Sequence, residues 1–391
     1  MIKYSRLGMD RQLNEIVFAG SHDAAITSGA ENAQTQSLDV LGQANAGVRF
    51  FDIRIGAQTV AGLGDTKGVQ LRAFHAQSLA KDTKIRHSTD VGRDVEVERN
   101  KLKHESLGEA WGLGLSKILR DAKAFVESAD GRSEFLILKF DKCSNWALIA
   151  ETCQKVLGNR IFSTASNVNT MLLSQLAGKV ICAFMTPGYS QLKLANQRVG
   201  ITHIKNLYKP PAGYDQNFSG LQYWGAGGTK INNSSFDDKI RENIATQRKI
   251  LRSAATGIKD KKTTFTRKVK QEGCAAANPN AMGMMYWTTT GVFKNIQTRN
   301  SQMWDSRRLA GLDAIWKSGF EDYISNALPE NIDAMSFSSG GTLKLFMPNI
   351  VMIDFADTHK CEHIYGLNTV AGVELVKVCQ KLDIHGGRHD F

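Results

Sequence analysis

The sequence predicts a closed (β/α)8-type barrel, in which eight parallel strands alternate with covering helices. Short runs rich in β-branched and aromatic residues recur at wide intervals, and helix-period segments lie between several of them. Strands that alternate with helices form a parallel sheet covered by helices. A strand set of this number, spread over 391 residues of 42% hydrophobic content, favours one closed barrel with insertions over two open sheets.

The predicted elements divide the chain as follows. Candidate strands lie at 15–20, 48–55, 69–75, 134–140, 179–185, 221–224, 284–290 and 349–355, and candidate helices at 106–128, 145–158, 236–254 and 371–382. The charged span 76–104 predicts a loop or short β-ribbon, and the turn-rich span 186–235 predicts long loops. We therefore expect one barrel domain over 1–391, with insertions near 76–104 and 186–280.

The composition limits the classes of protein that fit. A formal net charge of +11 favours an anionic partner, but no nucleic-acid motif or basic-aromatic interleaving is visible. The six cysteines contain no CxxC pair, which predicts free thiols. No stretch approaches the ~20 apolar residues of a membrane-spanning helix, and the first residues lack a signal-peptide pattern. The sequence predicts a soluble protein, either cytoplasmic or exported by a route that needs no signal peptide.

Polar side chains stand at the ends of several predicted strands. The carboxyl ends of barrel strands meet at one face, which is where barrel enzymes build their sites. Asp52 and Arg54 are two residues apart, so their side chains project from the same side of the strand. The strand-end residues are His22, Asp23, Asp52, Arg54, His75, Asp141 and Asp354.

Two histidines with one arginine suit nucleophilic displacement at a phosphodiester. One imidazole takes the proton of the attacking oxygen, the other protonates the leaving oxygen, and the guanidinium neutralises charge on the phosphoryl oxygens. Carboxylates would orient each imidazole by accepting its second N–H. No metal is needed for this chemistry.

The same residues carry a resemblance to a known family. "AGSHDAAIT", "GVRFFDIRI" and "FHAQSL" resemble the opening block of the X-domain of phosphatidylinositol-specific phospholipases C. "EFLILKFDK", "MMYWTTTG" and "PNIVMIDF" resemble later strands of that domain. The resemblance is strong over 15–75 and weaker over 131–145 and 284–382, and it implies an irregular TIM-like barrel.

The resemblance implies a role for each strand-end residue. His22 would be the general base and His75 the general acid, Arg54 would bind the phosphoryl oxygens, Asp354 would orient His22, and Asp23 would act on the leaving-group side. Arg54 stands where the calcium-dependent branch has an acidic ligand, which implies the metal-independent bacterial branch. Asp52 belongs to the same catalytic set, and we expect Asp141 to be the ion-pair partner of Arg54. Asp23, Asp52 and Asp141 leave a divalent cation as a lesser alternative.

The residues expected to contact the substrate are Asp141, Lys139, Thr186, Tyr223 and Trp287. Thr186 and Tyr223 stand where family members carry an arginine and an acidic residue for inositol, so the head group is the least determined feature. The expected partner is a phospholipid membrane surface, of anionic type, and the basic segment 248–273 is either a solvated face or a contact to anionic lipid. Export by a route that needs no signal peptide would be expected of a secreted effector that acts in virulence.

Two other functions remain open at this point. One is a metal-dependent phosphodiesterase on the same barrel, similar to glycerophosphodiesterases or sphingomyelinase D. The other is a lipid-binding module that has lost turnover. The oligomeric state is not readable from the sequence.

Overall fold

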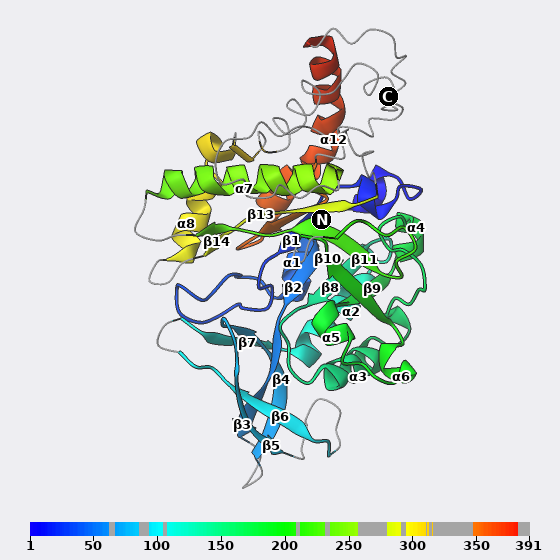
Figure 1. The fold of residues 1–391 in the computed structure, drawn as a ribbon, viewed down its shortest axis with the longest axis vertical. Coiled ribbons are helices and arrows are strands. Elements are labelled where there is room, and N and C mark those ends of the chain that lie inside the picture. Colours follow the sequence, from blue (N-terminus) through cyan, green and yellow to red (C-terminus); the bar gives the residue numbers. More distant parts are fainter. Residues whose placement is uncertain are drawn as a thin grey trace.

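Eight parallel strands close into a barrel in the computed structural model (Figure 1), which confirms the predicted fold class. Around the barrel the strands follow the order β1 (Phe18–Ser21), β15 (Ile350–Ile353), β13 (Met282–Trp287), β11 (Leu221–Gly225), β10 (Ile201–Asn206), β9 (Lys179–Met185), β8 (Phe135–Phe140) and β2 (Val48–Ile53). The structure describes residues 1–61, 67–85, 94–104, 108–208, 212–230, 235–256, 280–290, 295–309, 311–312, 315 and 347–381.

In the described residues, seven further strands lie outside the barrel. Three form an antiparallel sheet in the order β3 (Ile55–Ala61), β4 (Lys67–His75) and β7 (Ala110–Gly114), and two form an antiparallel pair, β5 (Ala80–Ile85) and β6 (Val97–Lys101). The parallel pair is β12 (Thr229–Lys230) and β14 (Thr289–Thr290). The antiparallel strands project from the carboxyl end of β2, at the bottom of Figure 1.

The helices lie around the barrel and at its ends (Figure 1). Those within the described residues are α1 (Val40–Ala46), α2 (Leu115–Glu127), α3 (Trp146–Leu157), α4 (Leu173–Leu176), α5 (Thr186–Tyr189), α6 (Ala195–Arg198), α7 (Phe236–Thr256), α8 (Ile296–Met303) and α12 (Thr358–Lys381), with short 3₁₀ turns at Tyr4–Leu7, Leu13–Glu15 and Gly158–Arg160. The predicted helices at 145–158 and 236–254 correspond to α3 and α7, and α12 includes most of the one predicted at 371–382. The predicted helix at 106–128 begins only at Leu115, because Ala110–Gly114 forms β7.

The barrel strands read as continuous apolar runs because both of their faces are covered. Every residue of β2, β8 and β15 is buried, as expected for parallel strands between a packed interior and a layer of helices. The helix α2 turns one face inward, with buried residues three and four apart, such as Leu115, Ile118 and Leu119.

One predicted barrel strand was wrong. The run 69–75 lies in β4, which pairs antiparallel with β3 outside the barrel. The eighth barrel strand is β10, "ITHIKN", which lies within the span 186–235 that was predicted to form long loops, because its polar residues interrupt the apolar run. Apolar β-branched and aromatic residues predict a strand, but they do not say whether its partner runs parallel or antiparallel. Only Arg54 separates β2 from β3, so the chain leaves the barrel before it reaches His75.

A buried ion pair lies near the amino ends of β2 and β8. Arg49 Nε and Glu134 Oε2 are 2.9 Å apart, and both side chains are fully buried. The Glu134 carboxylate also accepts from the backbone N–H groups of Tyr4 and Ser5, and the Arg49 guanidinium donates to the carbonyl of Ile2. This network joins the first residues of the chain to the barrel, at the end opposite the strand-end residues described next.

Within the described residues, Cys143, Cys153, Cys182 and Cys361 are free thiols, as predicted. No helix in the described part of the chain is both long and apolar enough to cross a bilayer. The basic segment 248–273 is described only as far as residue 256, where it belongs to α7; its remainder lies outside the described residues.

Candidate active site

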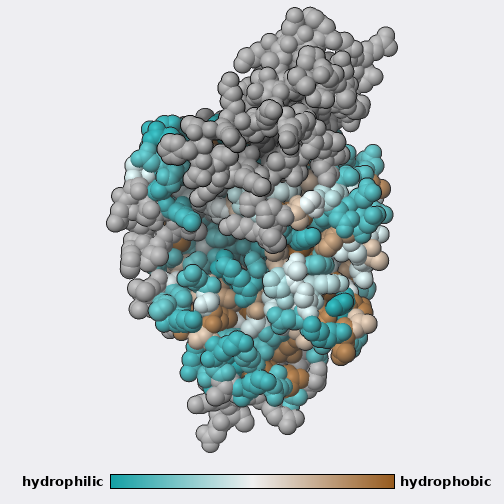
Figure 2. All heavy atoms as spheres, viewed as in Figure 1, coloured by the Kyte–Doolittle hydropathy of each residue, from teal (hydrophilic) through white to brown (hydrophobic). Residues whose placement is uncertain are grey.

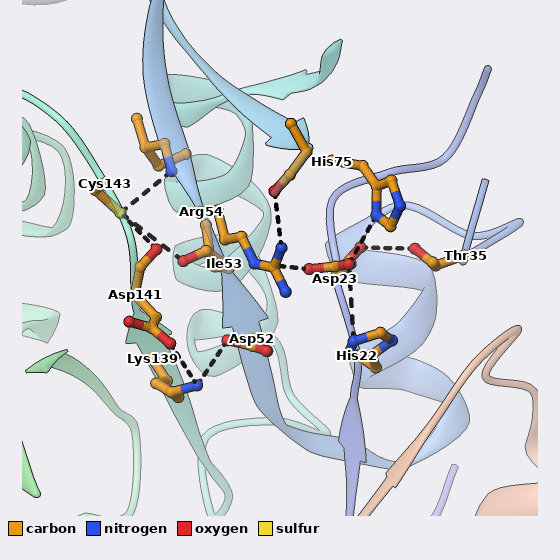
Figure 3. Close-up of polar contacts among 12 residues, drawn as sticks. His22, Asp23, Thr35, Asp52, Ile53, Arg54, His75, Lys139, Asp141 and Cys143 are labelled. Carbon is orange, nitrogen blue, oxygen red and sulfur yellow. Dashed lines mark hydrogen bonds and ion pairs between the residues drawn. The ribbon is translucent and has the colours of Figure 1, made fainter. Parts of the chain in front are cut away.

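Strand-end residues from different elements converge at the carboxyl end of the barrel (Figure 3). His22 and Asp23 directly follow β1, Asp52 lies near the end of β2, and Arg54 is the residue between β2 and β3. His75 ends β4 and reaches the same place from the antiparallel sheet. The structure brings these five side chains together, as predicted. His75, however, lies on a strand of the antiparallel sheet and not on a barrel strand.

Asp23 is the common partner of the cluster. Its Oδ2 is 2.9 Å from His75 Nδ1 and 3.7 Å from His22 Nε2, and its Oδ1 is 3.2 Å from Arg54 Nε. The carboxylate is nearly fully buried. Burial would raise the pKa of Asp23, but the charges of Arg54 and His22 and the hydrogen bond to His75 together outweigh it and hold that pKa well below its usual range.

The backbone at Asp23 is held in an uncommon conformation. Its φ is +42°, in the left-handed region that few residues other than glycine adopt. The hydroxyl of Thr35 donates to the Asp23 carbonyl, at 2.9 Å, and the N–H of Ala24 donates to the carbonyl of Asp52, at 2.8 Å. These bonds fix the turn that aims the Asp23 carboxylate at both imidazoles and the guanidinium.

His22 is oriented by a second carboxylate. Its Nδ1 lies 3.0 Å from Asp354 Oδ1, and the backbone N–H of Thr289 donates to Asp354 Oδ2 at 2.8 Å. Burial lowers the pKa of His22, but the charges of Asp23 and Asp354 outweigh this and raise it to about 9. The free protein therefore carries a proton on His22 at neutral pH.

A second group of charged side chains lies beside the cluster around Asp23. Lys139 Nζ is 2.9 Å from Asp52 Oδ1 and 3.5 Å from Asp141 Oδ2, and the Lys139 side chain is buried. Burial lowers the pKa of Lys139, but interactions with Asp52, Tyr223, Tyr286 and Asp141 together outweigh it and raise that pKa well above its usual value. The predicted Asp141–Arg54 ion pair was wrong: Asp141 pairs with Lys139, because Arg54 bends toward Asp23 (Figure 3).

The remaining predicted substrate residues lie in different surroundings. Tyr223 is buried near Lys139, its hydroxyl is 3.9 Å from Met185 Sδ, and burial raises its pKa to about 12. Thr186 is exposed, and its hydroxyl is 3.0 Å from His203 Nε2. Neither touches the Asp23 cluster through a contact in the described part of the chain.

Trp287 does not lie at the cluster. It is fully buried, and its indole N–H donates to the carbonyl of Met303 in α8. Successive strand residues point to opposite sides, so the adjacent Tyr286 faces inward and meets the ring of His22 edge-on, with centroids 6.2 Å apart. The sequence analysis chose the wrong one of the two aromatic residues, and it also missed Thr289 and Thr35, which contribute through single hydrogen bonds.

The described residues contain one group that could hold a metal ion. One ligand atom each of His22, Asp23 and Asp52 lies within 4.8 Å of the others. Arg54 already neutralises Asp23, and Lys139 already neutralises Asp52. A metal ion bound here would be repelled by the positive charges of Arg54 and Lys139 or would have to displace them. This set of ligand atoms therefore fits a metal poorly.

No family model matches the chain, but two curated relatives do. Both are named 1-phosphatidylinositol phosphodiesterase and come from Staphylococcus aureus, strains Newman and NCTC 8325 / PS 47. Each is 27% identical over 255 residues, covering 61% of this chain and 62% or 59% of the relative. The chain is therefore related in sequence to these two phosphodiesterases. It spans about three fifths of the length of these phosphodiesterases.

A solved structure of a mutant phosphatidylinositol-specific phospholipase C from Staphylococcus aureus overlaps 92% of this chain and 95% of its own, with 17% identity and a TM-score of 0.40. That similarity is too low to compare the two sites residue by residue. The relation to these phosphodiesterases rests on the sequence match.

Proposed function

We propose that this chain is a phosphodiesterase of the phospholipase C type, which cleaves phosphatidylinositol or a related phospholipid at an anionic membrane surface. One observation carries the proposal: two imidazoles and one guanidinium converge on the single buried carboxylate of Asp23. The relation to proteins named 1-phosphatidylinositol phosphodiesterase supports the substrate class.

His22 is the general base in this mechanism. Asp354 holds Nδ1, which leaves Nε2 to take the proton of a hydroxyl next to the phosphodiester, or of water where the head group has no such hydroxyl. That oxygen attacks phosphorus, and the bond from phosphorus to the glycerol oxygen breaks. His22 starts this step only after it has lost the proton that Asp23 and Asp354 stabilise.

His75 is the general acid toward the leaving oxygen. Its Nδ1 is bound to Asp23, and its side chain is about one quarter exposed, so the other nitrogen is free to meet a substrate. Arg54 forms an ion pair with the other oxygen of the Asp23 carboxylate. Its guanidinium neutralises the charge that develops on the phosphoryl oxygens. Asp23 thereby sets the spacing between the acid and the phosphate-binding cation.

Lys139, Asp52, Asp141 and Tyr223 form the polar wall beside this centre and are the residues we assign to the head group. The charged network holds Lys139 between two carboxylates, which presents both donors and acceptors to a polyol. This arrangement suits a head group rich in hydroxyls.

The metal-dependent alternative rests on the His22, Asp23 and Asp52 group. Phosphorus NMR of the products from phosphatidylinositol and from other phospholipids, recorded in EDTA, tests both. Release of a cyclic or open phosphorylated head group in EDTA supports the proposal. Activity that appears only with added calcium or magnesium would establish the alternative.

A lipid-binding module without turnover is the third outcome. His22→Ala should abolish release of the phosphorylated head group from mixed vesicles and leave vesicle binding unchanged. If the unaltered protein binds vesicles and releases nothing from any phospholipid tested, the phosphodiesterase proposal is wrong.

A further inference from the structure

A second polar pocket lies on the outside of the barrel, beside β10. It encloses about 230 Å³, and its lining includes Ser163, Thr164, Tyr189, Arg198, His203 and Ser219. His203 pairs across the sheet with Phe184, whose ring packs on Trp146 of α3, outside the barrel. None of the residues around Asp23 lines this pocket, so it is separate from the candidate active site.

Aromatic rings hold His203 in a fixed position. Its ring stacks on Tyr189 at 4.5 Å with an interplanar angle of 3°, and Phe218 packs against it at 4.9 Å. The Thr186 hydroxyl is 3.0 Å from Nε2. The Arg198 guanidinium lies 5.2 Å from the centre of the Tyr189 ring. One wall of the pocket is therefore a rigid stack that ends in a cation.

The charges around the pocket are positive. In the described part of the chain, neither Arg198 nor Lys205 has a carboxylate within ion-pair distance, and the Arg198 Nε donates to the carbonyl of Leu192. Burial, together with the charges of Lys205 and Arg198, lowers the pKa of His203 to about 4. A guanidinium beside hydroxyls, with no anion from the described chain, is an arrangement that favours a phosphate group.

Exposed apolar side chains stand next to this cation. Leu194 and Val199 flank α6 on either side, and each is 59% exposed, the highest values among the large hydrophobic residues of the described chain. Figure 2 shows hydrophobic surface, in brown, over the region where Figure 1 labels α3 and α6. Apolar residues beside a basic pocket are what the headgroup and upper acyl region of a bilayer would contact.

We propose that the pocket beside β10 binds the phosphate of a membrane lipid, with Arg198 on the phosphate and Leu194 and Val199 in the interfacial layer. This second lipid site lies outside the catalytic barrel. It goes beyond the proposed function, because it would hold the protein on a membrane whether or not the lipid bound there is ever cleaved.

Sedimentation with vesicles tests the site. The probes are vesicles of phosphatidylcholine alone and of phosphatidylcholine with phosphatidylglycerol. Arg198→Gln should lower partitioning onto the anionic vesicles about fivefold, from roughly 1 kcal/mol per basic residue at such a surface. The double variant Leu194→Ser, Val199→Ser should lower it comparably. Arg120→Gln removes the same charge from an exposed position on α2 and should change partitioning less than twofold.

The histidine ring provides a direct readout on the unaltered protein. Short-chain phosphatidylglycerol, followed by NMR, should shift the His203 ring signals and raise its pKa, while cleavage of a soluble phosphodiester by Arg198→Gln stays unchanged. Equal losses for Arg198→Gln and Arg120→Gln, or unmoved His203 signals, would overturn the proposal. It would be overturned as well if glycerol phosphate moved those signals and the double variant bound vesicles normally, because the pocket would then serve a soluble phosphate compound.

Discussion

The contact between His22 and Asp354 gives the sharpest test of the proposed mechanism. In Asp354→Asn, one oxygen of the carboxylate is replaced by an NH2 group. The two oxygens now accept from different donors, His22 Nδ1 and the backbone N–H of Thr289. An amide offers a single oxygen, so one donor loses its acceptor in a fully buried place.

The expected size follows from those two donors. If the amide oxygen stays with Thr289, its NH2 faces His22 Nδ1, which must then become an acceptor and place the ring proton on Nε2. That tautomer cannot act as the base, and comparable substitutions that leave the wrong tautomer cost ~10⁴ in kcat. Loss of the negative charge also lowers the pKa of His22 from its value of about 9.

The assay is release of phosphorylated head group from mixed micelles of phosphatidylinositol, in EDTA, with the His22 ring followed by NMR. Asp357→Asn is the matched control, because its side chain is half exposed and pairs with Lys360, away from the cluster. We expect at least a hundredfold loss in kcat for Asp354→Asn and less than a twofold change for the control. If Asp354→Asn keeps its kcat within twofold and the pKa of His22 does not fall, the assigned role of Asp354 is wrong.

Three further predictions concern stability and charge. Because the pKa of His22 is raised from 6.5 to about 9, its contribution to stability, roughly 3 kcal/mol, is fully present below pH 6.5 and lost as the pH rises through 9; urea unfolding should show this loss in the unaltered protein but not in His22→Ala. Arg54→Met should lower kcat/KM by about 10² or more in EDTA, because it removes the phosphate-binding cation, and recovery of that loss by added calcium would instead favour the metal-dependent alternative. Glu134→Gln should destabilise the fold by about 3 kcal/mol or more, since it leaves the Arg49 charge buried without its partner; a change below 1 kcal/mol in the free energy of unfolding would contradict that.

The barrel and the central cluster were predictable because both follow from short-range patterns. The runs that became β2, β8 and β15 are apolar enough to be buried on both faces, and strand-end positions mark the functional face of a barrel. His22, Asp23 and Arg54 were therefore placed together correctly. His75 was placed correctly for a partly wrong reason, because its strand lies in the antiparallel sheet rather than in the barrel.

Two features could not be predicted from the sequence: which carboxylate pairs with Arg54, and the existence of strand β10. Arg54 could bond to Asp23 or to Asp141, and only the turn at Asp23, with its positive φ, decides between them. Strand β10 was missed because Thr202, His203 and Lys205 break its apolar pattern; Thr202 and His203 contribute to the lining of the second pocket. The choice of Trp287 over Tyr286 shows that a shift of one residue along a strand reverses which side chain faces the site.

The charges of the candidate site couple substrate binding to the protonation of the base. Four carboxylates, those of Asp23, Asp52, Asp141 and Asp354, share the site with the permanent cations Arg54 and Lys139 and with two imidazoles. The site approaches neutrality only when both imidazoles are protonated, so a phosphodiester anion binds best in that state. The base must then give up its proton before it can act. We therefore expect kcat to rise toward pH 9 while KM also rises, because the neutral form of His22 reacts faster and binds the anion less well. Parallel loss of both trends in Asp354→Asn would connect them to His22, whereas a KM that falls as kcat rises would contradict this coupling.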